Sequence, residues 1–367
     1  MSKYSYDIVG SFLRPKKLKE ARAKFTSGEI SAQDLKEIED ECIKELVEKE
    51  KELNLPFITD GEFRREYWHL DFLSFIGGIK RVKASKWSVE FKGNKPKANT
   101  IVIEDKIHFD KSHPFLNHFK FLANLTQNAK MTIPSPSMLH LIPCVREENY
   151  EPIEIYAKDD NQIYKDIANT YIDAMKEFYK LGCKHLQLDD TSWGEFCDAE
   201  KVKAYEARGV NLEKIKDNYV WMLNEIVKAK PDDMIVSVHV CRGNFRSTWF
   251  SSGGYESVAK VLFGKCNVDM FFLEYDNDRS GGFEPLRYIK DQKVVLGLIT
   301  SKFPELEDKD SIKARVKEAI KFVSLDQLLL STQCGFSSTE EGNELSEDEQ
   351  WAKIRLVQEL AKEIWGE

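Results

Sequence analysis

The chain has 367 residues, of which 42% are hydrophobic and 32% charged, a balance typical of a globular protein with a sizeable core. Its formal net charge of −8 argues against a general nucleic-acid or membrane-surface binder, because both of those surfaces are anionic. The N-terminal residues lack the apolar core of a secretory signal, and no apolar run approaches the roughly 18 residues of a spanning helix. We therefore expect a cytoplasmic protein, whose seven dispersed cysteines are free thiols.

Eight short runs of apolar and β-branched residues recur along the chain, and each closes on small or polar residues. They lie at 6–11, 56–62, 131–135, 185–190, 234–239, 270–274, 293–299 and 327–331. Helical periodicity predicts helices near 31–53, 161–181, 211–229, 311–323 and 346–364. Strands without clean alternation, separated by helices, indicate a parallel sheet buried on both faces. Eight such units predict an α/β fold of the closed (β/α)8 type, a TIM barrel, as one domain over residues 1–367.

The interval 80–115 interrupts this alternation of strands and helices. Its stretches WSVEFKG (87–93) and TIVIEDKIHF (100–109) read as extra strands around a turn rich in Gly, Asn, Pro and Lys. We therefore predict an inserted β-hairpin near residues 80–115. A doubly wound open sheet is the alternative architecture, but no G-x-G-x-x-G follows any predicted strand, so a dinucleotide site has no support.

Polar or titratable side chains follow nearly every predicted strand, at the end where a barrel of this kind carries its reactive groups. They are Ser11, Asp60, Glu62, Ser135, Ser137, Asp189, Asp190, His239, Cys241, Glu274, Asp276, Lys302 and Cys334. Because the strand ends of a barrel converge on one cleft, the joint pattern predicts a functional site there. His185 precedes the fourth predicted strand, at the end opposite the cleft, and is read as structural. The remaining histidines have no clustered partners and receive no role: His69, His108, His113, His118 and His140.

One nitrogen, two sulfurs and one carboxylate among these side chains form a candidate metal site: His239, Cys241, Cys334 and Glu274. Residues i and i+2 of a strand share a face, so His239 and Cys241 can point at one centre. This donor set suits Zn²⁺, whereas Mg²⁺ and Ca²⁺ prefer oxygen ligands. Alternatively, each residue is an ordinary buried thiol, core histidine or rim carboxylate. Four together at converging strand ends favour the metal site.

With these residues assembled, the chain resembles the catalytic barrel of cobalamin-independent methionine synthase, and more closely the short single-barrel proteins of that family in bacteria. The resemblance covers nearly the whole chain. HVC (239–241), FFLE (271–274) and QCG (333–335) match the family's His-x-Cys, Glu and Cys-Gly strand ends in order and spacing. It implies that His239, Cys241, Glu274 and Cys334 are Zn²⁺ ligands.

The resemblance also implies a pocket for homocysteine. VGSF (9–12) matches the segment that contacts the substrate carboxylate, which assigns Ser11. DGEF (60–63) and QLDDT (187–191) match acidic positions that bind the substrate amino acid, which assigns Glu62 and Asp189. The implied activity is that of a methyltransferase of the 5-methyltetrahydropteroyltriglutamate–homocysteine type, in which zinc activates the homocysteine thiol and methionine is formed.

The sequence departs from the family in two places. Where the family has a histidine proposed as proton donor to the leaving folate, this chain reads GLITSK, so Lys302 or Asp190 becomes the candidate acid. The chain is also too short for the second, N-terminal barrel that helps the long enzymes to bind polyglutamyl folate. The methyl donor therefore stays open between folate, methylcobalamin and S-methylmethionine.

Two other functions stay open from the sequence alone. One is zinc-dependent alkyl transfer to another small thiol, of the coenzyme-M type, which would not need Glu62 and Asp189 to bind an amino group. The other is a non-catalytic zinc barrel that serves as a binding or sensor protein. A homo-oligomer is compatible with the sequence, whereas a nucleic-acid or membrane partner is not expected.

Overall fold

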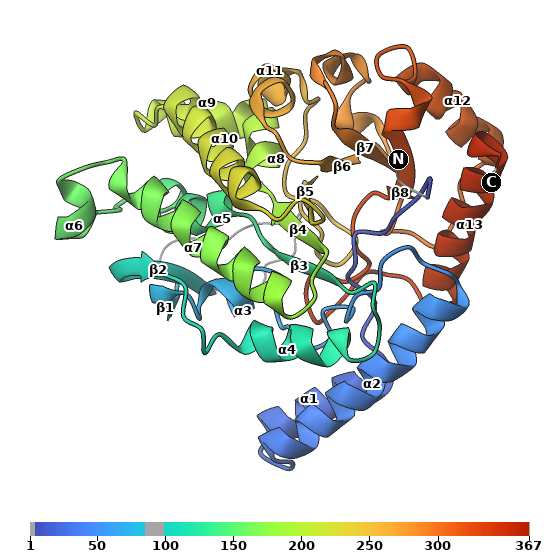
Figure 1. Cartoon of the computed structure of the whole chain (residues 1–367), viewed down its shortest axis with the longest axis horizontal. Coiled ribbons are helices and arrows are strands. Elements are labelled where there is room, and N and C mark those ends of the chain that lie inside the picture. The colour runs from blue at the N-terminus through green and yellow to red at the C-terminus, as the bar shows by residue number, and fades with distance from the viewer. Residues whose placement is uncertain (1–3, 85–98, 367) are drawn as a thin grey trace.

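A parallel sheet of six strands forms the centre of the protein in the computed structural model, which describes residues 4–84 and 99–366 (Figure 1). Its strands follow one another in chain order: β3 (Lys130–Pro134), β4 (His185–Asp190), β5 (Ile235–Val240), β6 (Met270–Glu274), β7 (Lys293–Ile299) and β8 (Leu328–Thr332). Nearly every residue of these strands is buried, as the continuous apolar runs predict for a parallel sheet covered on both faces. The α/β class with a parallel sheet is thereby confirmed.

The first two predicted strands, at 6–11 and 56–62, are not strands of this sheet. They contact its edges and each other only through isolated parallel bridges, which pair Tyr6 with Leu330, Ser11 with Gly61, and Ile58 with Ala129. Their extended course is interrupted by positive φ angles of 122° at Gly10, 64° at Gly61 and 61° at Glu62. Six of the eight predicted strands are therefore confirmed, and closure of the sheet into a barrel stays a prediction.

Helices surround the sheet in Figure 1, and all five helices predicted from the sequence are present. They are α2 (Ala32–Glu52), α7 (Gln162–Lys180), α10 (Leu212–Ala229), α12 (Lys309–Ala319) and α13 (Glu347–Trp365). Ser31 and Asp34 form the predicted capping box at the start of α2. Further helices are α1 (Lys16–Thr26), α3 (Leu70–Leu73), α4 (Pro114–Ala123), α5 (Pro136–His140), α6 (Glu154–Ala157), α8 (Ser192–Cys197), α9 (Ala199–Ala207) and α11 (Glu256–Lys265).

An antiparallel hairpin lies between α3 and α4, where the sequence predicts an insertion. Its strands are β1 (Gly77–Lys83) and β2 (Asn99–His108), and β2 coincides with the predicted strand TIVIEDKIHF. The other predicted strand, WSVEFKG at 87–93, lies outside the described residues. The hairpin packs near α7 and the residues after α5, so it flanks the C-terminal side of the sheet.

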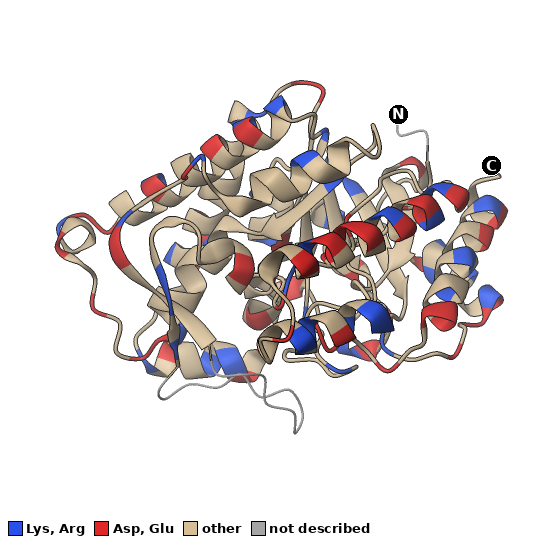
Figure 2. Ribbon diagram, turned by 90° about the horizontal axis from the view of Figure 1, so that it is seen from below, with Lys and Arg blue, Asp and Glu red and all other residues tan. Residues whose placement is uncertain are grey.

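Acidic and basic side chains are mixed along the outer helices, as Figure 2 shows, in keeping with the modest net charge of −8. Within residues 4–84 and 99–366, no helix has both the length and the apolar character to cross a membrane.

Candidate metal centre and substrate pocket

The four candidate metal ligands meet at the C-terminal ends of the central strands. His239 lies in β5, Cys241 directly follows it, Glu274 ends β6, and Cys334 comes two residues after β8. All four side chains are buried, and one potential ligand atom of each lies within 4.8 Å of the others. Parallel pairing of β5 with β6 and of β7 with β8 brings these ends to one edge of the sheet. The cluster could therefore hold a metal ion.

Unmet bonding capacity at this cluster fits a metal better than a core packing role. Both ring nitrogens of His239 are buried without a hydrogen-bond partner, although buried polar atoms are normally satisfied. The sulfurs of Cys241 and Cys334 lie 3.6 Å apart as free thiols. Burial lowers the pKa of His239, but the Cys334 sulfur and the nearby Asp189 and Glu274 carboxylates raise it to about 9. The surroundings thus favour a positive charge at their centre.

Glu274 is held in place by two hydrogen bonds, one from a charged side chain and one from a backbone N–H group. Arg279 Nη2 donates to its Oε2 over 2.7 Å, and the Arg242 backbone N–H donates to its Oε1 over 3.0 Å. Burial raises the pKa of Glu274, but Arg279, Lys302 and His239 together bring it below its usual value. This carboxylate is therefore ionised at neutral pH although it is fully buried.

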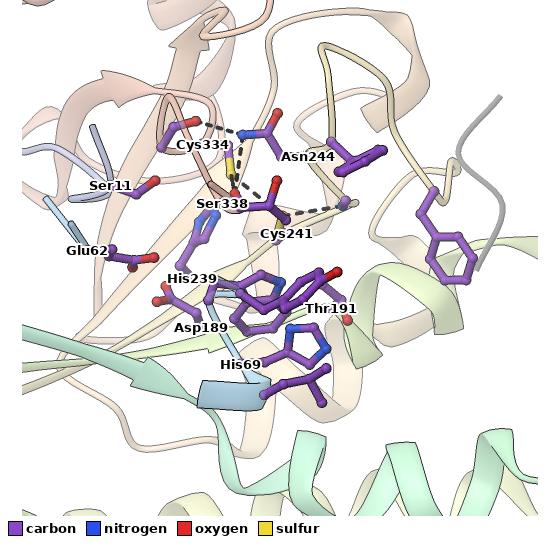
Figure 3. A pocket seen from close by; sticks show the side chains of 18 of the residues that line it. Ser11, Glu62, His69, Asp189, Thr191, His239, Cys241, Asn244, Cys334 and Ser338 are labelled. Carbon is purple, nitrogen blue, oxygen red and sulfur yellow. Dashed lines mark hydrogen bonds between the residues drawn. The ribbon is translucent and has the colours of Figure 1, made fainter. Parts of the chain in front are cut away.

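A cavity of about 110 Å³ opens beside the cluster and is lined by His239, Cys241 and Cys334. Ser11, Glu62 and Asp189, the three predicted substrate-binding residues, line the same cavity (Figure 3). The Ser11 hydroxyl sits so close to Gly335 that a Cβ on that glycine would lie 1.9 Å from its Oγ. The glycine after Cys334 is therefore required by close approach of the Ser11 side chain.

Glu62 presents one carboxylate oxygen to the cavity while the other is held by the protein. Thr132 Oγ1 donates to Oε1 over 2.9 Å, and Arg65 lies 3.2 Å from the same atom. Oε2 is buried without a hydrogen-bond partner. Burial raises the pKa of Glu62, although Arg65 and Arg14 oppose the shift. Its positive φ of 61° is a strained backbone conformation, of the kind that concentrates at functional sites.

Asp189, near the end of β4, lies beside Glu62 in Figure 3. Gln187 Nε2 donates to its Oδ1 over 2.8 Å. Burial, with a contribution from the Glu62 charge, raises the pKa of Asp189 to about 7. Two carboxylates with raised pKa values in one cavity are arranged to receive a cationic group.

Comparison with known proteins places this arrangement in a family. Residues 6–362 match the family model described as the cobalamin-independent synthase, catalytic domain. The chain belongs to this family. Its members are methionine synthase-like methyltransferases, so the chain belongs to a methyltransferase family.

Individual relatives extend over nearly the full chain. The uncharacterized protein YxjH of Bacillus subtilis (strain 168) is 46% identical over 98% of this chain and 94% of its own length. The crystal structure of the putative vitamin-B12 independent methionine synthase from Listeria monocytogenes is 44% identical, with a TM-score of 0.78, and covers 99% of this chain and 98% of that one. A B12-independent methionine synthase from Shewanella sp. W3-18-1, in complex with selenomethionine, shares the fold at 19% identity, with a TM-score of 0.73 and the same coverage.

The two predicted proton donors, Lys302 and Asp190, are not among the residues that line the cavity. Asp190 is fully buried and caps α8: its Oδ1 accepts the Ser192 backbone N–H over 2.6 Å, and its Oδ2 accepts the Ser135 hydroxyl over 2.5 Å. The Lys302 ammonium is also buried and is directed at oxygens of the chain segment after Cys241. A catalytic role for either residue stays a prediction, and neither side chain borders the space where substrates would meet.

Sequence reasoning missed several side chains that line the cavity. They are Tyr67, Trp68, His69, Asn99, Thr100, Ile142, Arg146, Phe245 and Phe250. His69 was given no role, yet it borders the cavity, its Nδ1 has no partner, and burial lowers its pKa to about 3. Arg146, which also lines the cavity, donates through Nε to Glu195 over 3.0 Å. The sequence offered one sign that His69 lies near the site: it is seven residues after Glu62, in the same segment before α3.

Proposed function

We propose that the protein transfers a methyl group to the thiol of homocysteine to give methionine, with Zn²⁺ held by His239, Cys241, Glu274 and Cys334. The observation that carries this proposal is the shared cavity: three of the four candidate ligands, whose atoms lie within 4.8 Å of one another, border the same space as two buried carboxylates. A small molecule with a thiol and an ammonium group matches both features, because the thiol can bind the metal and the ammonium group can pair with the carboxylates. The selenomethionine bound by the Shewanella protein supports a methionine-like product in this fold.

Zinc fits the donor set better than other common metals. Two thiolates, one imidazole and one carboxylate are typical ligands of Zn²⁺. When bound, zinc lowers the pKa of a coordinating substrate thiol, so that the sulfur is a thiolate at neutral pH, although a free thiol has a pKa of about 8.5. Three anionic ligands keep that sulfur electron-rich and therefore nucleophilic.

The other residues of the cavity bind and orient the amino acid. Glu62 and Asp189 are placed to accept hydrogen bonds from the ammonium group, and the Ser11 hydroxyl is placed to donate to the carboxylate. Fixing both ends of the amino acid aims its sulfur, which supplies the orientation that a reaction between two molecules requires. Phe245, Phe250 and Trp68 line the remaining wall and exclude water from the thiolate.

Zinc content and thiol ionisation test the metal and the acceptor. We expect one zinc per chain in the purified protein, and release of about one proton when homocysteine binds the zinc form. Cys241→Ser and Cys334→Ser should lose the metal, whereas Cys266→Ser, at an equally buried free thiol outside the cavity, should keep it. Unchanged zinc content in the first two variants would show that the ligand assignment is wrong.

A panel of methyl donors with homocysteine as acceptor tests the reaction. It contains methyltetrahydrofolate with one and with several glutamates, methylcobalamin and S-methylmethionine, and methionine formation is measured. We expect turnover with at least one donor and poor turnover when 2-mercaptoethanesulfonate, which lacks an ammonium group, replaces homocysteine. Equal use of both thiols would favour alkyl transfer to a coenzyme-M-like acceptor. No turnover with any donor would favour the binding or sensor function.

A further inference from the structure

The Lys302 side chain makes a set of contacts that a general acid would not need. Its Nζ donates to Asn244 Oδ1 over 2.8 Å, and to the backbone carbonyls of Gly243 and Thr248 over 3.2 Å each. An ammonium group has three N–H donors, and here each of them has an acceptor. All three acceptors belong to residues 243–250, which we call the cavity loop because Gly243, Asn244, Phe245 and Phe250 line the cavity.

The cavity loop is strained and depends on outside contacts for its shape. Arg246 and Ser247 have φ angles of 45° and 61°, in the left-handed region that non-glycine residues disfavour. Strain of this kind persists only where the surroundings impose it. Ser247 Oγ donates to the Lys302 carbonyl over 2.5 Å, and the Ser247 backbone N–H donates to Asn343 Oδ1 over 3.0 Å. Lys302 therefore forms hydrogen bonds to the cavity loop through both its side chain and its backbone carbonyl.

The same loop joins the two cysteines of the metal cluster. The Gly243 N–H donates to the Cys241 sulfur over 3.3 Å, and Asn244 Nδ2 donates to the carbonyl of Gly335, next to Cys334, over 2.7 Å. Figure 3 shows Asn244 beside Cys334 and Ser338. A cation that fixes Asn244 and its neighbours therefore fixes one wall of the space in which the sulfur reacts.

We propose that Lys302 is a positioning residue that holds the cavity loop closed over the reacting sulfur, and that it does not donate the proton. The inference rests on the proposed function, because the closed wall serves methyl transfer to a thiolate. Lys302 is 1% exposed, does not line the cavity, and has its N–H groups directed at loop oxygens. Without the ammonium, the buried Gly243 carbonyl and the partly buried Thr248 carbonyl lose this donor, Asn244 Oδ1 is left with its bond from Asn343 Nδ2, and the strained turn relaxes.

Lys302→Met tests the proposal, with Lys302→Arg as the conservative variant. Lys293→Met is the matched control, since Lys293 lies at the other end of β7 and its side chain donates to the Asp326 carbonyl, far from residues 243–250. We expect Lys302→Met to keep its zinc, to exchange the backbone amides of 243–250 at least tenfold faster, and to raise KM for the methyl donor at least tenfold. The shape of the pH–rate profile should not change. Lys302→Arg should recover part of the loss, and Lys293→Met should behave as native.

A different pattern would overturn the proposal. Loss of one limb of the pH–rate profile in Lys302→Met, with native amide exchange at 243–250, would identify Lys302 as the acid. If Lys302→Met does not fold, Ser247→Ala, which removes the bond to the Lys302 carbonyl and the acceptor of the Glu344 backbone N–H, should give a smaller acceleration at the same amides, and native exchange there would contradict the proposed positioning role. The exchange measurement needs no turnover. It therefore tests whether Lys302 positions the cavity loop even if the proposed methyl transfer is wrong.

Discussion

Two buried polar clusters occupy opposite ends of the central sheet, and they differ in how their bonding capacity is used. At the N-terminal end, Lys130 at the start of β3 pairs with Asp7 over 3.2 Å, and His185 at the start of β4 bonds to Ser237 over 2.8 Å. At the C-terminal end, His239 has two ring nitrogens without partners, and Glu62 has an unpaired oxygen. The N-terminal cluster pairs its charges within the protein, although His185 Nδ1 has no hydrogen-bond partner, whereas the unmet groups at the C-terminal end converge on a cavity, which favours a ligand there.

His185 and His239, one in each cluster, differ in the same way in their protonation. Burial and the Lys130 charge lower the pKa of His185 well below its usual value, so this histidine is neutral. His239 is equally buried, but the Cys334 sulfur and two carboxylates raise its pKa to about 9. The sign of the surrounding charge, and not burial alone, therefore separates a core histidine from one placed at a cation site.

The largest effect on stability is expected at the N-terminal end. Lys130→Met leaves the fully buried Asp7 carboxylate without its cation, which should lower the free energy of unfolding by about 3–5 kcal/mol. Zinc content of the folded variant should not change. Chemical denaturation measures the loss, with Lys230→Met as control, because the Lys230–Asp269 pair is partly exposed.

A double variant tests whether the lost stability comes from the unpaired Asp7 charge. Asp7→Asn combined with Lys130→Met removes both charges, so it should recover much of the stability that Lys130→Met loses. A double variant less stable than Lys130→Met, or a zinc loss specific to Lys130→Met, would contradict the division of the molecule into a structural and a ligand-binding end.

At the C-terminal end, Asp189→Asn should weaken homocysteine binding and leave stability nearly unchanged. The pKa of Asp189 is raised to about 7, so the group is protonated below pH 7 and then has no charge for an ammonium group. Native affinity should therefore fall as the pH drops from 8 to 6. We expect the variant to bind about 10- to 100-fold more weakly at pH 8, the loss typical of a charge-assisted hydrogen bond, and to show a weaker pH dependence, since only ionisation of the substrate thiol then contributes.

Calorimetric titration with homocysteine across this pH range measures both effects. Asp233→Asn is the control, because Asp233 pairs with Lys184 on the surface. An Asp189→Asn variant that keeps the native pH dependence would assign the titration to another group and remove Asp189 from the ammonium site.

Much of the metal cluster could be predicted from sequence, because parallel strands bring their C-terminal ends together whatever the details of the loops. His239, Cys241, Glu274 and Cys334 needed only strand order and the residue types at strand ends. The first two strands were overpredicted because apolar runs do not reveal the positive φ angles at Gly10 and Gly61. An apolar run in the sequence indicates that a segment is buried, but it does not indicate where the backbone turns away from the sheet.

The far wall of the cavity could not be predicted for a different reason. His69 reaches the cavity from a loop before α3, whose course depends on contacts distant in the sequence. The acceptors around Lys302 are mostly backbone carbonyls 54 to 59 residues earlier in the chain, and carbonyls carry no sequence signal. A lysine at the end of a strand therefore reads as a titratable group until its partners are known.

The smallest predicted effect separates positioning from binding within the substrate site. Thr132→Val keeps the shape of the side chain but removes the bond from its hydroxyl to Glu62 Oε1, which leaves Arg65 alone to orient that carboxylate. We expect KM for homocysteine to rise about fivefold, equivalent to about 1 kcal/mol, with native zinc content. Thr170→Val, which removes an equally buried hydroxyl bond within α7, should leave KM unchanged. An effect of Thr132→Val as large as that of Asp189→Asn would mean that Glu62 orientation, more than the Asp189 charge, governs binding of the amino group.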